Sequence, residues 1–135
     1  MPLGVARVAR CGDDVSLIAW SAAVELCGRA ADVLAAQGIS AEVLDLGTLV
    51  PLDVEAILAA ARRTGQVVVV PEAPLWGGFG AEIGATIQEE AFPFLDGPVR
   101  RVAGWDTPYP PGRLEDLCLP TVERVVGAAR AAVLE

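Results

Sequence analysis

The chain has 135 residues, 53% of them hydrophobic, with a net charge of −8 and no histidine. This length is typical of one domain, and the acidic charge disfavours nucleic acid and anionic membranes as partners while suiting a basic protein. Without histidine the chain lacks the commonest general base and metal ligand, so it is a poor candidate for a complete enzyme.

Composition also bounds the compartment. Cys11, Cys27 and Cys118 are odd in number and lack metal-like spacing, so we expect neither a disulfide framework nor a metal centre. The apolar runs are short and interrupted by charge, and the first ten residues hold two arginines, so we expect no membrane span and no signal peptide. These features favour the cytosol. A mean hydropathy of +0.48 suggests that some surface is buried against a partner.

The first half of the chain predicts three strands and two helices, at residues 5–10 (edge strand), 15–20 (strand), 21–37 (helix), 41–46 (strand) and 53–65 (helix). Ser21 and Asp53 are the expected N-caps, and Gly38 and Gly65 are the expected helix ends. The predicted buried stripe of the first helix consists of Ala23, Leu26, Cys27, Ala30, Val33 and Leu34.

The second half is organised around residues 67–90. Val67 to Val70 form a continuous β-branched run, typical of a strand buried on both faces. Prolines and the cluster Gly77-Gly78-Phe79-Gly80 then break the pattern, and a helix is expected from Ala81 to about Phe92.

The remaining elements are a strand, a long arm and a helix. We expect the strand at residues 99–103 and an irregular arm rich in proline and glycine at residues 104–120. Thr121 is the expected N-cap of the last helix. Loops as long as this arm usually carry function or wrap a partner. Strands alternating with helices predict an α/β sandwich with helices on both faces of the sheet. In such sheets, sites lie outside the carboxyl ends of the strands.

The glycine cluster is similar to a dinucleotide-binding fingerprint, because it follows a strand and opens a helix. The third glycine falls at Gly84, one place too late for that motif, and Glu72 and Glu82 would repel a diphosphate. A free-standing nucleotide- or small-ligand-binding module is therefore the alternative interpretation. The simpler one is that the glycines let the chain turn tightly and pack against its own sheet or another subunit.

An ordered set of short motifs resembles the C-terminal domain of the β subunit of 2-oxo acid dehydrogenase E1 components, within the transketolase C-terminal domain superfamily. The motifs include Gly12-Asp13-Asp14-Val15, Pro51-Leu52-Asp53, Glu72-Ala73-Pro74, Gly77-Gly78-Phe79-Gly80-Ala81-Glu82-Ile83, Phe94-Leu95-Asp96, Pro98-Val99-Arg100-Arg101-Val102 and Asp106-Thr107-Pro108. The resemblance covers essentially the whole chain. One departure is Pro71, where many relatives carry histidine before Glu-Ala-Pro.

The resemblance implies a three-layer α/β/α sandwich with a five-stranded mixed sheet and one antiparallel strand, for which residues 5–10 are the natural candidate. It implies enzymes that decarboxylate a 2-oxo acid on thiamine diphosphate and pass the acyl group to the lipoyl arm of E2. In that family the diphosphate and Mg²⁺ are held by the α subunit and the pyrimidine by the β subunit's N-terminal domain. Residues 1–135 are thus expected to be a single domain without catalytic, cofactor or metal residues, whose catalytic N-terminal half is absent.

The implied role is assembly with an E1 α subunit, a second E1 β subunit and the basic subunit-binding domain of E2. Asp96 and the C-terminal carboxylate of Glu135 are the candidates for the E2 contact. The candidates for subunit interfaces are Glu72, Gly77, Gly78, Phe79, Gly80, Trp105, Asp106 and Tyr109. For Glu72 we also consider that it accepts backbone N–H bonds from the glycine loop. A branched-chain 2-oxo acid is preferred over pyruvate, and the equivalent domain of transketolase is a further alternative.

Overall fold

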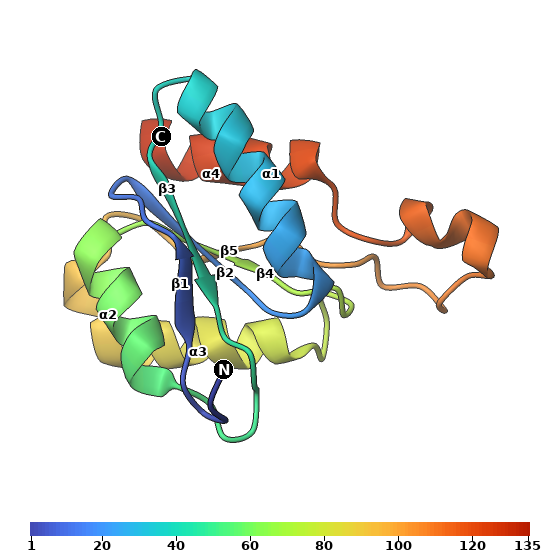
Figure 1. Cartoon of the computed structure of the whole chain (residues 1–135), viewed down its shortest axis with the longest axis horizontal. Coiled ribbons are helices and arrows are strands. Elements are labelled where there is room, and N and C mark those ends of the chain that lie inside the picture. Colours follow the sequence, from blue (N-terminus) through green and yellow to red (C-terminus); the bar gives the residue numbers. More distant parts are fainter.

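The computed structural model describes all 135 residues and places a five-stranded sheet between two layers of helices (Figure 1). The strands lie in the order β1-β3-β2-β4-β5, with bounds β1 (Arg7–Arg10), β2 (Val15–Ala19), β3 (Ala41–Asp45), β4 (Val67–Val70) and β5 (Arg100–Arg101). β1 pairs antiparallel with β3, and the other three pairings are parallel. The predicted three-layer architecture with one antiparallel edge strand is confirmed.

Four α-helices and two 3₁₀ helices complete the fold: α1 (Ala22–Ala36), α2 (Val54–Thr64), α3 (Phe79–Ala91), η1 (Phe92–Phe94), η2 (Gly112–Leu117) and α4 (Val122–Leu134). α1 and α4 cover one face of the sheet, and α2 and α3 cover the other (Figure 1). Successive side chains of a strand point to opposite faces, so Leu17 packs under α1 and α4 while Ile18 packs under α2 and α3.

Two of the three predicted caps are confirmed. The Asp53 carboxylate accepts the Ala56 N–H at 3.1 Å, and the Thr121 hydroxyl accepts the Arg124 N–H at 3.3 Å. The prediction for Ser21 is wrong, because its side chain makes no capping bond and its backbone has φ 56° and ψ −139°. Only two residues connect β2 to α1, and this short connection holds Ser21 in a left-handed region that residues with a Cβ rarely adopt.

Several predicted boundaries also shift. α3 begins at Phe79, two residues early, and β5 has two residues instead of five. Val33 is 40% exposed, because the buried stripe of α1 is shifted around the helix toward Ala31. Phe92 is 62% exposed because it lies in η1, beyond the end of α3. The predicted irregular arm contains the short helix η2.

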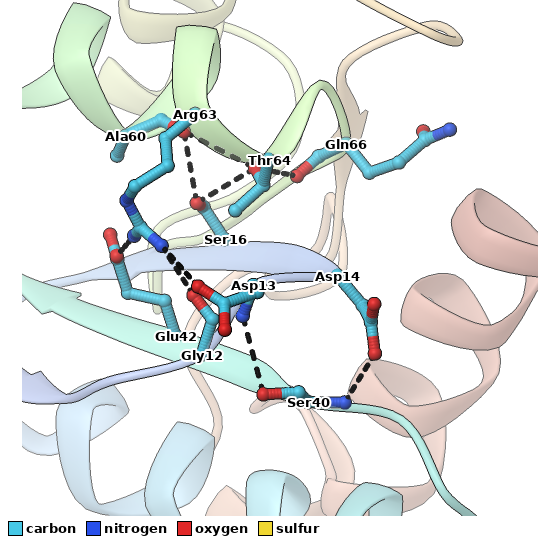
Figure 2. A network of polar contacts seen from close by, with 10 residues as sticks. All are labelled: Gly12, Asp13, Asp14, Ser16, Ser40, Glu42, Ala60, Arg63, Thr64 and Gln66. Atoms are coloured by element: carbon cyan, nitrogen blue, oxygen red, sulfur yellow. Dashed lines mark hydrogen bonds and ion pairs between the residues drawn. The ribbon is translucent and has the colours of Figure 1, made fainter.

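The edge of the sheet where the parallel strands begin, here called the amino edge, is held by a polar network (Figure 2). The Ser16 hydroxyl of β2 lies 3.0 Å from the Thr64 hydroxyl of α2, which also donates to the Ala60 carbonyl. Gly12 passes close to β3, because a Cβ there would lie 2.1 Å from the Ala41 carbonyl carbon.

Arg63 connects three elements within this network. Its guanidinium pairs with Glu42, which is 2% exposed on β3, and donates to the Gly12 carbonyl in the turn before β2 (Figure 2). A buried carboxylate requires such a partner, so Arg63 ties the end of α2 to the sheet. The loops that follow the parallel strands lie at the other edge of the sheet.

Candidate functional site

The loops that follow the parallel strands gather at one edge of the sheet, here called the carboxyl edge (Figure 1). They are residues 46–53 after β3, residues 71–78 after β4 and the arm, residues 104–120, after β5. Because β1 runs antiparallel, residues 1–6 also lie there, and the Gly4 N–H donates to the Thr48 hydroxyl at 2.9 Å. This is the edge at which α/β sheets usually carry their sites.

The glycine loop is shaped by contacts with its own chain. A Cβ on Gly78 would lie 2.3 Å from the Pro74 carbonyl oxygen, and one on Gly80 would lie 2.9 Å from the Pro71 ring. Gly77 has φ 73°, a conformation that favours glycine. At Gly78 and Gly80 the close neighbour is therefore the chain's own turn, and contacts of this loop with another subunit stay a prediction.

Phe79 anchors the start of α3. Its ring packs edge-on against Trp20, with 6.4 Å between the ring centroids. An open groove of about 840 Å³ lies beside it, between the N-terminal ends of α2 and α3. The Glu82 carboxylate lines this groove and would repel a phosphate, so the groove does not favour the nucleotide-binding alternative.

The arm is a preformed loop whose two ends are held together. The Trp105 N–H donates to the Cys118 carbonyl at 3.0 Å, which closes the base of the arm. The Asp106 carboxylate accepts the Trp76 N–H at 2.9 Å, so the arm is also fixed to the loop after β4. The Arg124 guanidinium stacks 4.3 Å from the centroid of the Trp105 ring. Beyond this base the arm extends away from the body of the molecule (Figure 1).

The carboxyl edge carries most of the exposed large hydrophobic side chains. Of fourteen exposed large hydrophobic side chains, nine lie on it: Met1, Leu3, Val5, Val50, Trp76, Trp105, Tyr109, Leu114 and Leu117. Trp76 is 81% exposed and Leu117 is 73% exposed. Large exposed apolar side chains gathered on one side of a protein mark an interaction surface. Leu114 and Leu117 were not predicted, although leucines three residues apart beside Pro110-Pro111-Gly112 are a signal of a short 3₁₀ turn.

Glu72 lies in a cavity of about 410 Å³ between the arm, α1 and α4. The lining residues are Ala22, Ala23, Leu26, Arg29, Glu72, Asp116, Leu119, Pro120, Thr121, Val122 and Glu123. The structure contains no hydrogen bond from the glycine loop to the Glu72 carboxylate, so that part of the hypothesis is wrong. Its role at an interface stays a prediction.

The two residues predicted to contact E2 lie away from this edge. Asp96 follows η1, and its backbone N–H donates to the Gly65 carbonyl at 2.8 Å just after α2 ends. Glu135 ends the chain beside α4, and its side chain lies 3.5 Å from Arg100 of β5. The exposed Phe92 and Phe94 rings precede Asp96.

The Cys27 thiol and the Tyr109 hydroxyl both have raised pKa values, which disfavour their ionised forms. Burial raises the pKa of the Cys27 thiol to about 12, which makes this thiol a poor nucleophile. The hydrogen bond with Glu115 is the largest cause that raises the pKa of the exposed Tyr109 hydroxyl to about 12, and this bond ties the two sides of the arm together. No three His, Cys, Asp or Glu side chains are grouped to hold a metal ion. None of the helices combines the length and apolar character needed to cross a bilayer.

The family model of the transketolase C-terminal domain matches residues 4–125. The chain belongs to the transketolase C-terminal domain family. Among curated proteins it is 43% identical to the pyruvate dehydrogenase E1 component subunit beta of Leifsonia xyli subsp. xyli, over 93% of this chain and 37% of that protein. It is 45% identical to the 3-methyl-2-oxobutanoate dehydrogenase subunit beta of Mycobacterium tuberculosis, over 93% of this chain and 36% of that protein.

Solved structures agree with this family. A split-gene transketolase, described as an inactive beta4 tetramer, superposes with a TM-score of 0.83 at 33% identity, over 98% of this chain and 42% of that chain. The resemblance to E1 β subunits inferred from the motifs is confirmed. The chain spans little more than a third of the length of the curated relatives that it matches.

Proposed function

We propose that this chain is the C-terminal assembly domain of a β subunit of a thiamine-diphosphate-dependent 2-oxo acid dehydrogenase E1 component. The observation that carries the proposal is the carboxyl edge, where nine exposed apolar side chains and a preformed arm stand ready for a partner. Family membership and 40–45% identity to E1 β subunits support it. The proposal assigns catalysis to the part of the subunit beyond the matched region, which covers 37% of one such relative.

The residues of this chain do not fit the cofactor themselves. Thiamine diphosphate and Mg²⁺ require phosphate-binding donors and oxygen ligands for the metal. The glycine loop is flanked by Glu72 and Glu82, and no group of three metal-ligating side chains exists. The proposal therefore leaves the cofactor to the rest of the enzyme and gives this domain no chemical step.

Assembly is divided between two surfaces in this proposal. The carboxyl edge contacts the E1 α subunit and a second E1 β subunit through the glycine loop, Trp105, Asp106 and Tyr109. Asp96 and the C-terminal carboxylate of Glu135 offer negative charge to the basic subunit-binding domain of E2. The split-gene transketolase neighbour is described as an inactive β4 tetramer, which supports self-association of the isolated β chain without activity.

The relatives support a 2-oxo acid as the class of substrate, without selecting one acid. Matches include β subunits named for pyruvate and for 3-methyl-2-oxobutanoate, at 43% and 45% identity. We propose a branched-chain 2-oxo acid as the first substrate to test and pyruvate as the second, in a cytosolic enzyme.

The test is reconstitution. The natural-length polypeptide that contains these residues is co-purified with its α subunit, and thiamine-dependent decarboxylation of 3-methyl-2-oxobutanoate and pyruvate is measured. We expect activity from the complex and none from the chain of residues 1–135 alone. A natural-length polypeptide that neither binds the α subunit nor supports decarboxylation would refute the proposal.

A further inference from the structure

The arm presents an apolar surface that its own chain leaves uncovered. Tyr109, Leu114 and Leu117 are exposed on the part of the arm that projects from the body. The closed base, the Asp106 contact and the Arg124 stack fix the point at which the arm leaves the body, and within the arm the Tyr109–Glu115 hydrogen bond and the helix η2 order the projecting part. A preformed surface loses little conformational entropy on binding, which favours affinity.

The cavity at the base of the arm is lined by both apolar and acidic residues. Leu26, Leu119 and Val122 are among its apolar lining residues. Three carboxylates, of Glu72, Asp116 and Glu123, line the same cavity against one guanidinium, of Arg29. The excess of negative charge, even beside the N-terminal ends of α1 and α4, suits a cationic head group whose aliphatic stem lies on the leucines. We refer to these lining residues as the acidic cavity.

A second copy of this chain has few cations to offer to the acidic cavity. All ten basic residues are arginines, and five of them already pair with carboxylates of their own chain: Arg7, Arg10, Arg62, Arg63 and Arg100. Arg124 stacks on Trp105, and Arg101 donates to the Leu75 carbonyl. Two of the remaining three, Arg29 and Arg113, belong to the acidic cavity and the arm themselves. The net charge of −8 on each copy adds a general repulsion.

We propose that the arm and the acidic cavity form one docking site for a different polypeptide, which presents an arginine or lysine within an apolar segment. The apolar segment covers Tyr109, Leu114 and Leu117, and the cation enters the acidic cavity. This inference rests on the proposed function, and it assigns the site to the α-type partner subunit because it lies on the carboxyl edge, away from Asp96 and Glu135. Contacts between two β chains then use other parts of that edge.

Two double variants of the natural-length polypeptide test the proposal, with the E1 α subunit as the probe. Leu114→Ser/Leu117→Ser removes apolar surface from the arm, and Glu72→Gln/Asp116→Asn removes charge from the acidic cavity. All four side chains are exposed, and circular dichroism checks that the variants fold. The matched controls are Leu134→Ser and Glu89→Gln/Glu90→Gln, which change exposed side chains on α4 and α3.

We expect each test variant to raise the Kd for the α subunit about tenfold or more, while the controls leave it within about twofold. The cavity variant should also weaken the dependence of this Kd on salt. Self-association of the β chain, measured by light scattering, should not change. The inference is overturned if wild-type protein binds the α subunit and the test variants bind it equally well, or if they lose self-association instead. Wild-type protein that binds no α subunit overturns the proposed function, and this inference with it.

Discussion

Replacement of Ser21 by glycine should stabilise the protein. Ser21 has φ 56° and ψ −139°, and a residue with a Cβ in such a conformation is strained by about 1–3 kcal/mol. Its side chain makes no capping hydrogen bond, so Ser21→Gly removes no such interaction from the folded state. Glycine also gives the unfolded chain more freedom, which opposes the gain by about 0.4–1 kcal/mol. The net expected increase in the free energy of unfolding is about 1 kcal/mol.

Urea unfolding followed by circular dichroism measures this change as a higher midpoint at an unchanged m-value. A calorimetric Tm should rise by about 3–4 °C for a chain of this size. Ser21→Ala is the matched control, since it removes the hydroxyl but keeps the Cβ and should leave the midpoint nearly unchanged. If Ser21→Gly lowers stability, or if Ser21→Ala raises it as much, backbone strain is not the reason and the reasoning fails.

Three further predictions concern the folded chain. Arg63→Ala should lower the free energy of unfolding by about 2–3 kcal/mol, because it leaves the buried Glu42 carboxylate unpaired. The control Arg62→Ala should change it by at most about 0.5 kcal/mol, and equal effects of the two variants would contradict the network in Figure 2. Gly78→Ala should lower the free energy of unfolding by about 2 kcal/mol because the new Cβ would collide with the Pro74 carbonyl oxygen. Gly127→Ala, which has open space around it on α4, should raise the free energy of unfolding by about 0.5–1 kcal/mol, and urea midpoints that move in the opposite directions would refute both expectations. Burial raises the pKa of the Cys27 thiol from 9.0 to about 12, so the unfolded chain loses this proton first and the free energy of unfolding should fall as pH rises from 9 toward 12. A Cys27→Ala variant whose free energy of unfolding falls equally steeply over this range would contradict the assignment to Cys27.

The sequence predicted the fold well where local chemistry and burial agree. Val67 to Val70 form the strand buried on both faces that their β-branched run indicates, and the carboxylate of Asp53 caps α2 as expected. Thr121 caps α4 for the same reason. In each case a single side-chain property decides the local structure, and tertiary packing does not oppose it.

The sequence failed where tertiary geometry decides. Serine is a common N-cap, yet the short turn between β2 and α1 places Ser21 in a conformation from which its hydroxyl does not cap. The Arg63–Glu42 pair joins residues 21 positions apart, and nothing in their local sequence marks them. The arm is irregular at its start, as expected. The hydrogen bond between Trp105 and Cys118 that closes its base joins backbone groups, which carry no sequence signal.

The two edges of the sheet have different roles: contacts at the amino edge stabilise the fold, and the carboxyl edge offers a surface for recognition. Helices cover both faces, so partners are left with the edges and the outer helix surfaces. The amino edge is tied by Arg63, Ser16 and Thr64, whose contacts join α2 to the strands and would be disturbed by an inserted partner (Figure 2). The carboxyl edge instead exposes Trp76 and Leu117 on loops that hydrogen bonds already hold to the rest of the chain. A partner can therefore bury these side chains without unfolding any element, which is the condition for a stable scaffold to serve as an assembly surface.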